Sequence, residues 1–202
     1  LQRTAALIEI SRRRKAQGEF WAAIGAAQSA LDIFETLQNT EQVGFSHMQI
    51  GRCQLALKEY NDALVSFAKA SECFQGVAND ADRGDALRAL GDAYEALEQP
   101  AEASLVRRDA IKLLESAESW TRAGIAALDL GESLGRGGKQ SEALEVFKQA
   151  EDLFKQGEDL IGSVRAKDRI AAALIDLNKI EDAMGYLWEA VITADYIEDD
   201  ER

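Results

Sequence analysis

The chain has 202 residues, 47% of them hydrophobic, and its 36 acidic and 23 basic residues give a formal net charge of −13. A surface with this charge repels nucleic acid and anionic lipid, so we expect neither as a partner. Every apolar run is short and interrupted by charged residues, which excludes insertion into a membrane. A single proline, with many Ala, Leu, Glu and Lys residues, predicts an all-α protein.

A pair of alanines recurs along the chain at a constant spacing. The first alanines of the pairs are Ala23, Ala63, Ala103, Ala143 and Ala183. The second alanine of each pair follows seven positions later, at Ala30, Ala70, Ala110, Ala150 and Ala190. Residues seven apart lie on the same face of a helix. Self-similarity at a fixed period of about 40 residues is the signature of a helical repeat array.

Each repeat contains two helical patterns joined by a turn. In the second repeat, Phe45 and Met48 belong to the first pattern, and Leu64 and Phe67 belong to the second. The turn around residues 57–61 corresponds in the other repeats to segments with residues that end or start helices: Gly18, Pro100, Gly138 and Asn178. Proline is well tolerated at the first position of a helix, so the second helix of the third repeat is expected to begin at Pro100.

Small residues also recur in the first helix of each repeat, twelve positions before the first alanine. They are Ser11, Gly51, Gly91, Gly131 and Ala171. A glycine inside a helix costs about 1 kcal/mol relative to alanine. Its recurrence therefore predicts that two helices approach each other closely at this point, as antiparallel pairs that stack on one another.

Several of these residues resemble the tetratricopeptide repeat (TPR) motif. An apolar residue precedes glycine in the first helix, as in Ile50-Gly51, Leu90-Gly91 and Leu130-Gly131. The second repeat then continues with Leu57, Tyr60, Ala63, Phe67 and Ala70. The resemblance implies a right-handed superhelical solenoid of five antiparallel helix pairs. It covers residues 1–202 as a single array, with repeats at about 4–43, 44–83, 84–123, 124–163 and 164–202.

The period distinguishes this chain from most of the family. At about 40 residues it exceeds the roughly 34 residues that are usual for a tetratricopeptide repeat. We expect the second helix or its following loop to hold the extra length, in segments such as Leu31–Gln42 and Cys73–Arg83. Long-period repeats of this kind are similar to those of signalling scaffolds and of the sensor regions of bacterial regulators.

The resemblance also implies a partner-binding groove, because first helices line the concave face in this family. The expected groove residues are Arg12, Lys15, Met48, Arg52, Leu55, Arg88, Asp92, Glu95, Leu128 and Glu132. The groove would be basic at its beginning and acidic from Asp92 onward, with Met48, Leu55 and Leu128 as apolar anchors. Ile8 and Arg12 stand where the family's carboxylate clamp needs lysine and asparagine, which argues against binding of chaperone tails.

No residue pattern indicates a catalytic, cofactor or metal site. His47 is the only histidine, and one histidine without convergent carboxylates or thiols does not form a metal site. Cys53 and Cys73 are isolated, as expected for small buried side chains in a reducing compartment. The segment Leu134–Ser141 lacks the spacing of a phosphate loop and is expected to be an inter-helix turn. The basic cluster Ser11–Lys15 is expected to be a solvated helix end with one face in the groove.

The sequence therefore predicts a cytoplasmic, non-enzymatic scaffold that binds a protein or peptide. The alternative is the peptide- or ligand-sensing domain of a larger bacterial-type regulator, since the chain begins at Leu1 rather than Met and is expected to be a fragment. No polar capping helix follows Trp188, Val191 and Ile192, so these residues are expected to be covered by a second copy, by further repeats, or to be left partly exposed. The acidic run 198–202 is expected to be solvated.

Overall fold

The computed structural model describes residues 2–200 of the chain, and the side chains of residues 6–197. This part of the chain forms ten α-helices and contains no strand. The helices are α1 (Gln2–Ala16), α2 (Phe20–Thr36), α3 (Thr40–Ala56), α4 (Tyr60–Gly76), α5 (Asp80–Ala96), α6 (Pro100–Ser116), α7 (Trp120–Arg136), α8 (Gln140–Gln156), α9 (Leu160–Asp176) and α10 (Ile180–Asp200). The all-α prediction is confirmed, and ten helices correspond to five helix pairs. The side chains of residues 198–202 lie outside the described part.

The long repeat period is filled by helix rather than by loop. Each helix from α2 to α9 has 17 residues, and the connections are turns of three residues, such as residues 37–39 between α2 and α3. Of the two alternatives, a longer second helix or a longer loop, the loop is therefore excluded. The first and second helices of a repeat have the same length, and Pro100 begins α6 as predicted.

Every turn between two helices has the same backbone conformation. Its middle residue lies in the left-handed region, from φ 52° at Glu118 to φ 78° at Gly18. After α2, the backbone N–H of Asn39 donates to the carbonyl of Phe34 at 3.0 Å, which is the Schellman arrangement of a helix end. The Asn39 side chain then accepts a hydrogen bond from the N–H of Gln42 at 3.1 Å and caps α3. The same residue thus ends one helix and begins the next.

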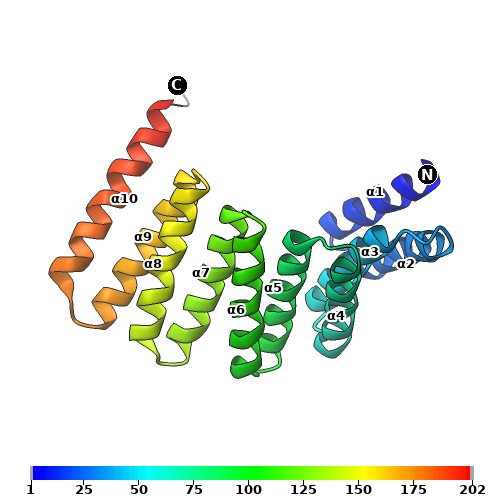
Figure 1. Ribbon diagram of the computed structural model, residues 1–202, viewed down its shortest axis with the longest axis horizontal. Helices are drawn as coiled ribbons and strands as arrows, with labels where there is room; N and C mark the ends of the chain where they lie inside the picture. Colours follow the sequence, from blue (N-terminus) through cyan, green and yellow to red (C-terminus); the bar gives the residue numbers. More distant parts are fainter. Residues whose placement is uncertain (1, 201–202) are drawn as a thin grey trace. The chain divides into compact units, whose positions relative to one another are not determined.

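The chain divides into two compact units, and the boundary falls within α6. The first unit comprises Leu1–Val106 and the second Arg107–Arg202. In each unit, helices that follow one another in the sequence pack side by side (Figure 1). The odd-numbered helices also contact one another, α1 with α3, α3 with α5, and α7 with α9, whereas in the described part of the chain α2 does not contact α4, nor α8 contact α10. The odd-numbered helices therefore lie on the inner side of each unit.

The alanine lattice forms the core, as predicted. All ten alanines are buried, and the most exposed of them, Ala190, is only 8% exposed. The small residues of the first helices permit the expected close approach, because a Cβ on Gly51 would lie 2.7 Å from the ring of Phe67. Ser11 is buried as well, and its hydroxyl donates to the carbonyl of Ala23 at 2.8 Å.

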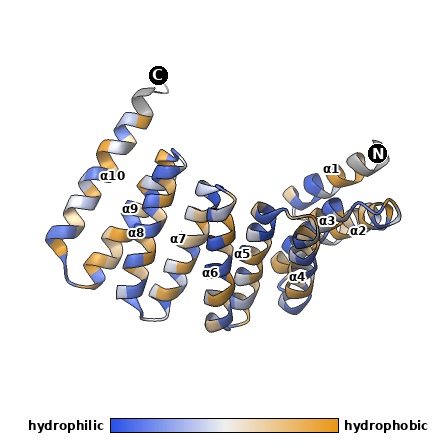
Figure 2. Cartoon of the chain, in the orientation of Figure 1, coloured by the Kyte–Doolittle hydropathy of each residue, from blue (hydrophilic) through white to orange (hydrophobic). Residues whose placement is uncertain are grey.

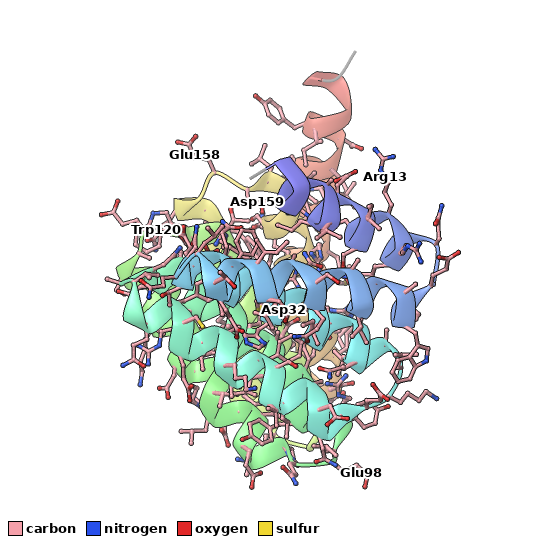
Figure 3. The ribbon with its side chains drawn as sticks, turned by 90° about the vertical axis from the view of Figure 1, so that its right-hand side faces the viewer. Arg13, Asp32, Glu98, Trp120, Glu158 and Asp159 are labelled. Atoms are coloured by element: carbon pink, nitrogen blue, oxygen red, sulfur yellow. The ribbon has the colours of Figure 1, made fainter. Side chains whose placement is uncertain are left out.

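Many charged side chains lie on the outside of the helices and in the turns, whereas Arg107, Glu151 and Lys167 are buried. Figure 3 shows Arg13 pointing away from α1, and Glu98 and Glu158 pointing away from their turns. Arg13 donates to the carboxylate of Glu9 one helical turn earlier, at 2.8 Å. Among residues 2–200, no helix has both the length and the uninterrupted apolar character needed to cross a lipid bilayer.

Candidate binding site on the inner helices

Eight of the ten predicted groove residues lie on the inner helices of the first unit. They are Arg12 and Lys15 on α1, Met48, Arg52 and Leu55 on α3, and Arg88, Asp92 and Glu95 on α5. The other two, Leu128 and Glu132, lie on α7 of the second unit. The helical repeat thus places the predicted residues of the first unit on three neighbouring helices of one face.

The basic residues of the first unit influence one another electrostatically. Burial lowers the pKa of Lys15, and the positive charge of Arg52 lowers it further. Burial also lowers the pKa of Arg52, followed by the charge of Arg88, whereas Asp85 and Asp92 act in the opposite direction. Lys15, Arg52 and Arg88 are half-buried. The charges on α1, α3 and α5 therefore form one row, in which cations are held near cations.

A cavity of about 180 Å³ lies beside this row, between α1 and α3. Its lining includes Ile8 and Arg12 from α1, Phe45 and Gln49 from α3, and the nearly buried Ser11 and Ala27. The ring of Phe45 is held in place by an edge-to-face contact with Phe74, with the ring centroids 5.0 Å apart. The cavity has apolar walls, and Arg12 and Gln49 add a guanidinium and an amide. It therefore suits an apolar side chain of a partner that is flanked by polar groups.

Two of the expected apolar anchors are parts of the core. Met48 is 4% exposed and Leu128 is 2% exposed, so neither side chain offers surface to a partner. Leu55 is half-buried and packs against the core around Phe67. The groove therefore offers a partner few apolar side chains of its own, and the cavity between α1 and α3 is the place where apolar contact is available.

Phe45 and Gln49 line the cavity although the sequence analysis did not assign them to the groove. The repeat period could have indicated that Phe45 lies near the groove. Phe45 occupies the same repeat position as Asp85, whose charge affects the pKa of Arg52. Phe45 has two roles, because its ring contacts that of Phe74 and the residue also lines the cavity.

The inner face of the second unit contains an ion pair between neighbouring first helices. The Nε of Arg169 on α9 lies 2.9 Å from the carboxylate of Glu132 on α7. With Leu128 in the core and Glu132 in an ion pair, the two predicted residues of this unit stabilise contact between repeats.

A protein-family model matches residues 58–197, which is more than half of the chain, and its description is soluble NSF attachment protein, SNAP. The chain belongs to the SNAP family. No curated protein matches its sequence.

Solved structures with the same fold support a helical-repeat assignment for this SNAP-family chain. BtubC (BKLC) from P. vanneervenii has a TM-score of 0.81 at 12% identity and covers 93% of this chain and 78% of its own. The TPR-like repeats of a Podosopora anserina putative kinesin light chain give 0.76 at 15% identity, covering 98% and 97%. A Rap protein in complex with Competence and Sporulation Factor gives 0.74 at 15% identity, covering 99% and 56%. Such identities establish the fold alone, and the predicted resemblance to TPR proteins is confirmed.

The remaining reactive side chains of the SNAP-family chain occupy packing positions. Cys53 is buried and Cys73 is half-buried, and burial raises the pKa of both thiols. Burial lowers the pKa of His47, with a smaller effect in the same direction from Lys69. In the described residues, no three His, Cys, Asp or Glu side chains are grouped so that they could hold a metal ion. Leu134–Ser141 spans the end of α7, a turn and the start of α8, as expected.

Proposed function

We propose that this SNAP-family chain is a non-enzymatic scaffold that binds an acidic segment of a protein or peptide along α1, α3 and α5. The observation that carries the proposal is the row of basic residues next to the cavity between α1 and α3. Arg12 lines that cavity, and Lys15 and Arg52 follow in the row. Asp92 and Glu95 lie farther along the inner face, on α5, where basic residues of the partner are favoured.

An added carboxylate is favoured near Lys15. Burial and the charge of Arg52 lower the pKa of Lys15, so its positive charge is held there at a cost in free energy that a nearby carboxylate would reduce, although Asp85 and Asp92 already act on Arg52. A guanidinium and a carboxylate form short, charge-assisted hydrogen bonds, which are stronger than neutral ones. An acidic side chain bound near Lys15 and Arg52 is therefore favoured over a neutral or basic one.

Exposed charges contribute little to affinity, so an apolar contact is also required. The cavity of about 180 Å³ provides it, because a partner side chain that enters would be removed from water between Ile8 and Phe45. Burying a Leu, Ile or Phe side chain contributes about 1.5–3 kcal/mol. The preferred ligand is thus a short segment with one apolar residue close to one or two carboxylates.

The comparisons support protein binding as a class of activity without identifying the partner. The family is named for attachment to NSF, and one structure of similar fold is a complex with Competence and Sporulation Factor. We carry over to this chain only that it attaches to another protein. A cytoplasmic location and a non-enzymatic role belong to our proposal.

The proposal can be tested with an array of short peptides that contain one Leu or Phe and zero to three Asp or Glu residues. The variant Arg52→Glu/Arg88→Glu should weaken the best acidic binder at least tenfold, which corresponds to about 1.4 kcal/mol. The matched control is Lys112→Glu/Lys139→Glu, which changes the net charge equally at side chains that are 76% and 58% exposed. The control should change the dissociation constant by less than about threefold at physiological salt.

A second variant separates the cavity from the charges. Gln49→Phe fills the cavity without altering the basic row, and it should weaken peptides with an apolar residue more than purely acidic ones. The proposal would be contradicted if the Arg52/Arg88 variant and the Lys112/Lys139 control weakened peptide binding equally. It would also be contradicted if the wild type bound no acidic peptide.

A further inference from the structure

The last helix of the chain, α10, has an apolar face that nothing in the described chain covers. Its exposed residues recur with helical spacing, and four of them are Met184 (65% exposed), Leu187 (40%), Trp188 (68%) and Val191 (52%). Figure 2 shows apolar segments along α10, among polar ones. A contiguous apolar strip of this kind on a helix is a site of association.

Two residues of this face occupy repeat positions that are buried on the preceding second helix. One repeat earlier, on α8, the positions of Met184 and Leu187 hold Leu144 and Phe147, each only 5% exposed. These two positions are covered there by the helices on both sides, because Phe147 lies against Gly131 of α7 and both residues share a core with residues of α9. The exposed strip on α10 is therefore the stacking face of a repeat, and the element that fits it is a first helix with the spacing of α3 or α9.

The first helix of the chain, α1, exposes the matching half of the same interface. Ile10 is 42% exposed, whereas the residues at its repeat position in the other first helices are covered: Ile50 (5%), Leu90 (9%), Leu130 (1%) and Ile170 (0%). Ile50 reaches its buried position by packing against Ala27 and Leu31 of the preceding second helix, α2. In the described part of the chain α1 contacts only α2 and α3, and no second helix covers Ile10 in this way.

The two helices carry opposite charge. The helix α1 contains five basic residues and one acidic residue, with four of the basic ones in the run Arg12–Lys15. The helix α10 contains seven acidic residues and no basic one. Opposite charges at an interface favour encounter and fix which surfaces pair. An α10–α10 contact would bring like charges together, whereas an α10–α1 contact would not.

We propose that α10 of one copy of this chain binds α1 of a second copy, so that the stacking of repeats continues from one molecule into the next. Leu187 and Met184 of one copy contact Ile10 of the other, and the exposed Arg13 and Arg14 of α1, which are not groove residues, face the acidic α10. This contact joins different surfaces of the two copies, so it is heterologous and produces rows of copies instead of a closed dimer. It is independent of the peptide groove proposed above.

Two single substitutions test the contact from its two sides. Leu187→Asp places a charge on the exposed face of α10, and Ile10→Asp does so on α1. The wild-type chain should show concentration-dependent growth in sedimentation velocity, weakened by added salt. Each variant alone should raise the apparent dissociation constant at least tenfold. Mixed together, the two variants should form a dimer and nothing larger, because one intact α10 and one intact α1 remain in the mixture.

The control is Val65→Asp, which places the same charge at an apolar side chain on α4 that is 55% exposed. It should leave the association unchanged, and circular dichroism should show all three variants folded. The proposal is overturned if the wild type remains a monomer up to on the order of 1 mM, the weak limit of specific association. It is equally overturned if Ile10→Asp associates as the wild type does, since the contact would then join α10 to α10.

Discussion

The two units of this SNAP-family chain use the same repeat position on their inner faces for opposite purposes. In the first unit that position holds Arg52. The charge of Arg52 lowers the pKa of Lys15, and the charge of Arg88 lowers the pKa of Arg52. In the second unit it holds Glu132, which is paired with Arg169 at 2.9 Å. Packing between helices is set by the alanine and glycine positions, which are alike in both units. The polar inner positions are therefore free to vary: in the second unit they form an ion pair, and in the first unit we propose that they bind a partner.

The largest effect is expected from removing a core ring of the second unit. Phe154 is fully buried and lies against both Gly124 and Gly162, so it connects α8 to the helices on either side. Phe154→Ala should reduce the free energy of unfolding by about 3–5 kcal/mol because of the cavity that it leaves. Urea unfolding followed by circular dichroism measures the loss. A loss below about 1 kcal/mol would mean that Phe154 does not connect the repeats.

A smaller loss is expected where a glycine allows two helices to touch. A Cβ on Gly131 would collide with the ring of Phe147, so Gly131→Ala should destabilise the protein by about 1–3 kcal/mol, although alanine favours helix. The control is Gly25→Ala on α2, where no atom lies within 4 Å of the added Cβ. That change should stabilise the protein by up to about 1 kcal/mol. Urea titrations of both variants measure the two changes in the free energy of unfolding. If Gly131→Ala and Gly25→Ala changed it in the same direction, the close approach at Gly131 would be contradicted.

The comparison between the units can be sharpened with two substitutions that each remove one charge. Glu132→Gln should lower the free energy of unfolding by up to about 1 kcal/mol, because it breaks a partly exposed ion pair. Lys15→Gln should leave the stability unchanged or raise it slightly, because it removes a cation from a repelling row. The same Lys15 variant should bind acidic peptides more weakly than the wild type. A loss of stability in the Lys15 variant would contradict the assignment of this row to binding.

The smallest effect concerns pH. Burial lowers the pKa of His47 from its ordinary value of 6.5, so the folded chain disfavours the protonated side chain. As the pH falls below 6.5, the unfolded chain takes up a proton that the folded chain does not, and stability decreases until the folded pKa is passed. His47→Leu, which copies Leu87 at the same repeat position, should remove this dependence. Because His47 is the only histidine, melting temperatures at pH 7 and pH 6 isolate its effect.

The sequence alone was sufficient for the fold class. Ala63 and Ala70 mark one face of a helix, Gly51 marks a close approach, and their return at a fixed period requires that each helix pair meets its neighbours in the same way. Local rules determine these features, because the helix period and the steric needs of small residues do not depend on distant parts of the chain. The left-handed turn residues were harder to predict, since only Gly18 and Gly138 are glycines and the other turns use residues such as Gln38 and Ala78.

Only the tertiary structure decided which inner residues remain accessible. Met48 and Leu128 have the sequence pattern of groove anchors, yet neighbouring helices bury them, while Phe45 has the pattern of a core residue and lines a cavity. Which charged side chains lie next to Arg52 and Glu132 likewise depends on the offset between adjacent helices. Periodicity states which face of a helix a residue occupies. How deeply that face is covered, and by which charges, is determined by side chains from other repeats, far away in the sequence.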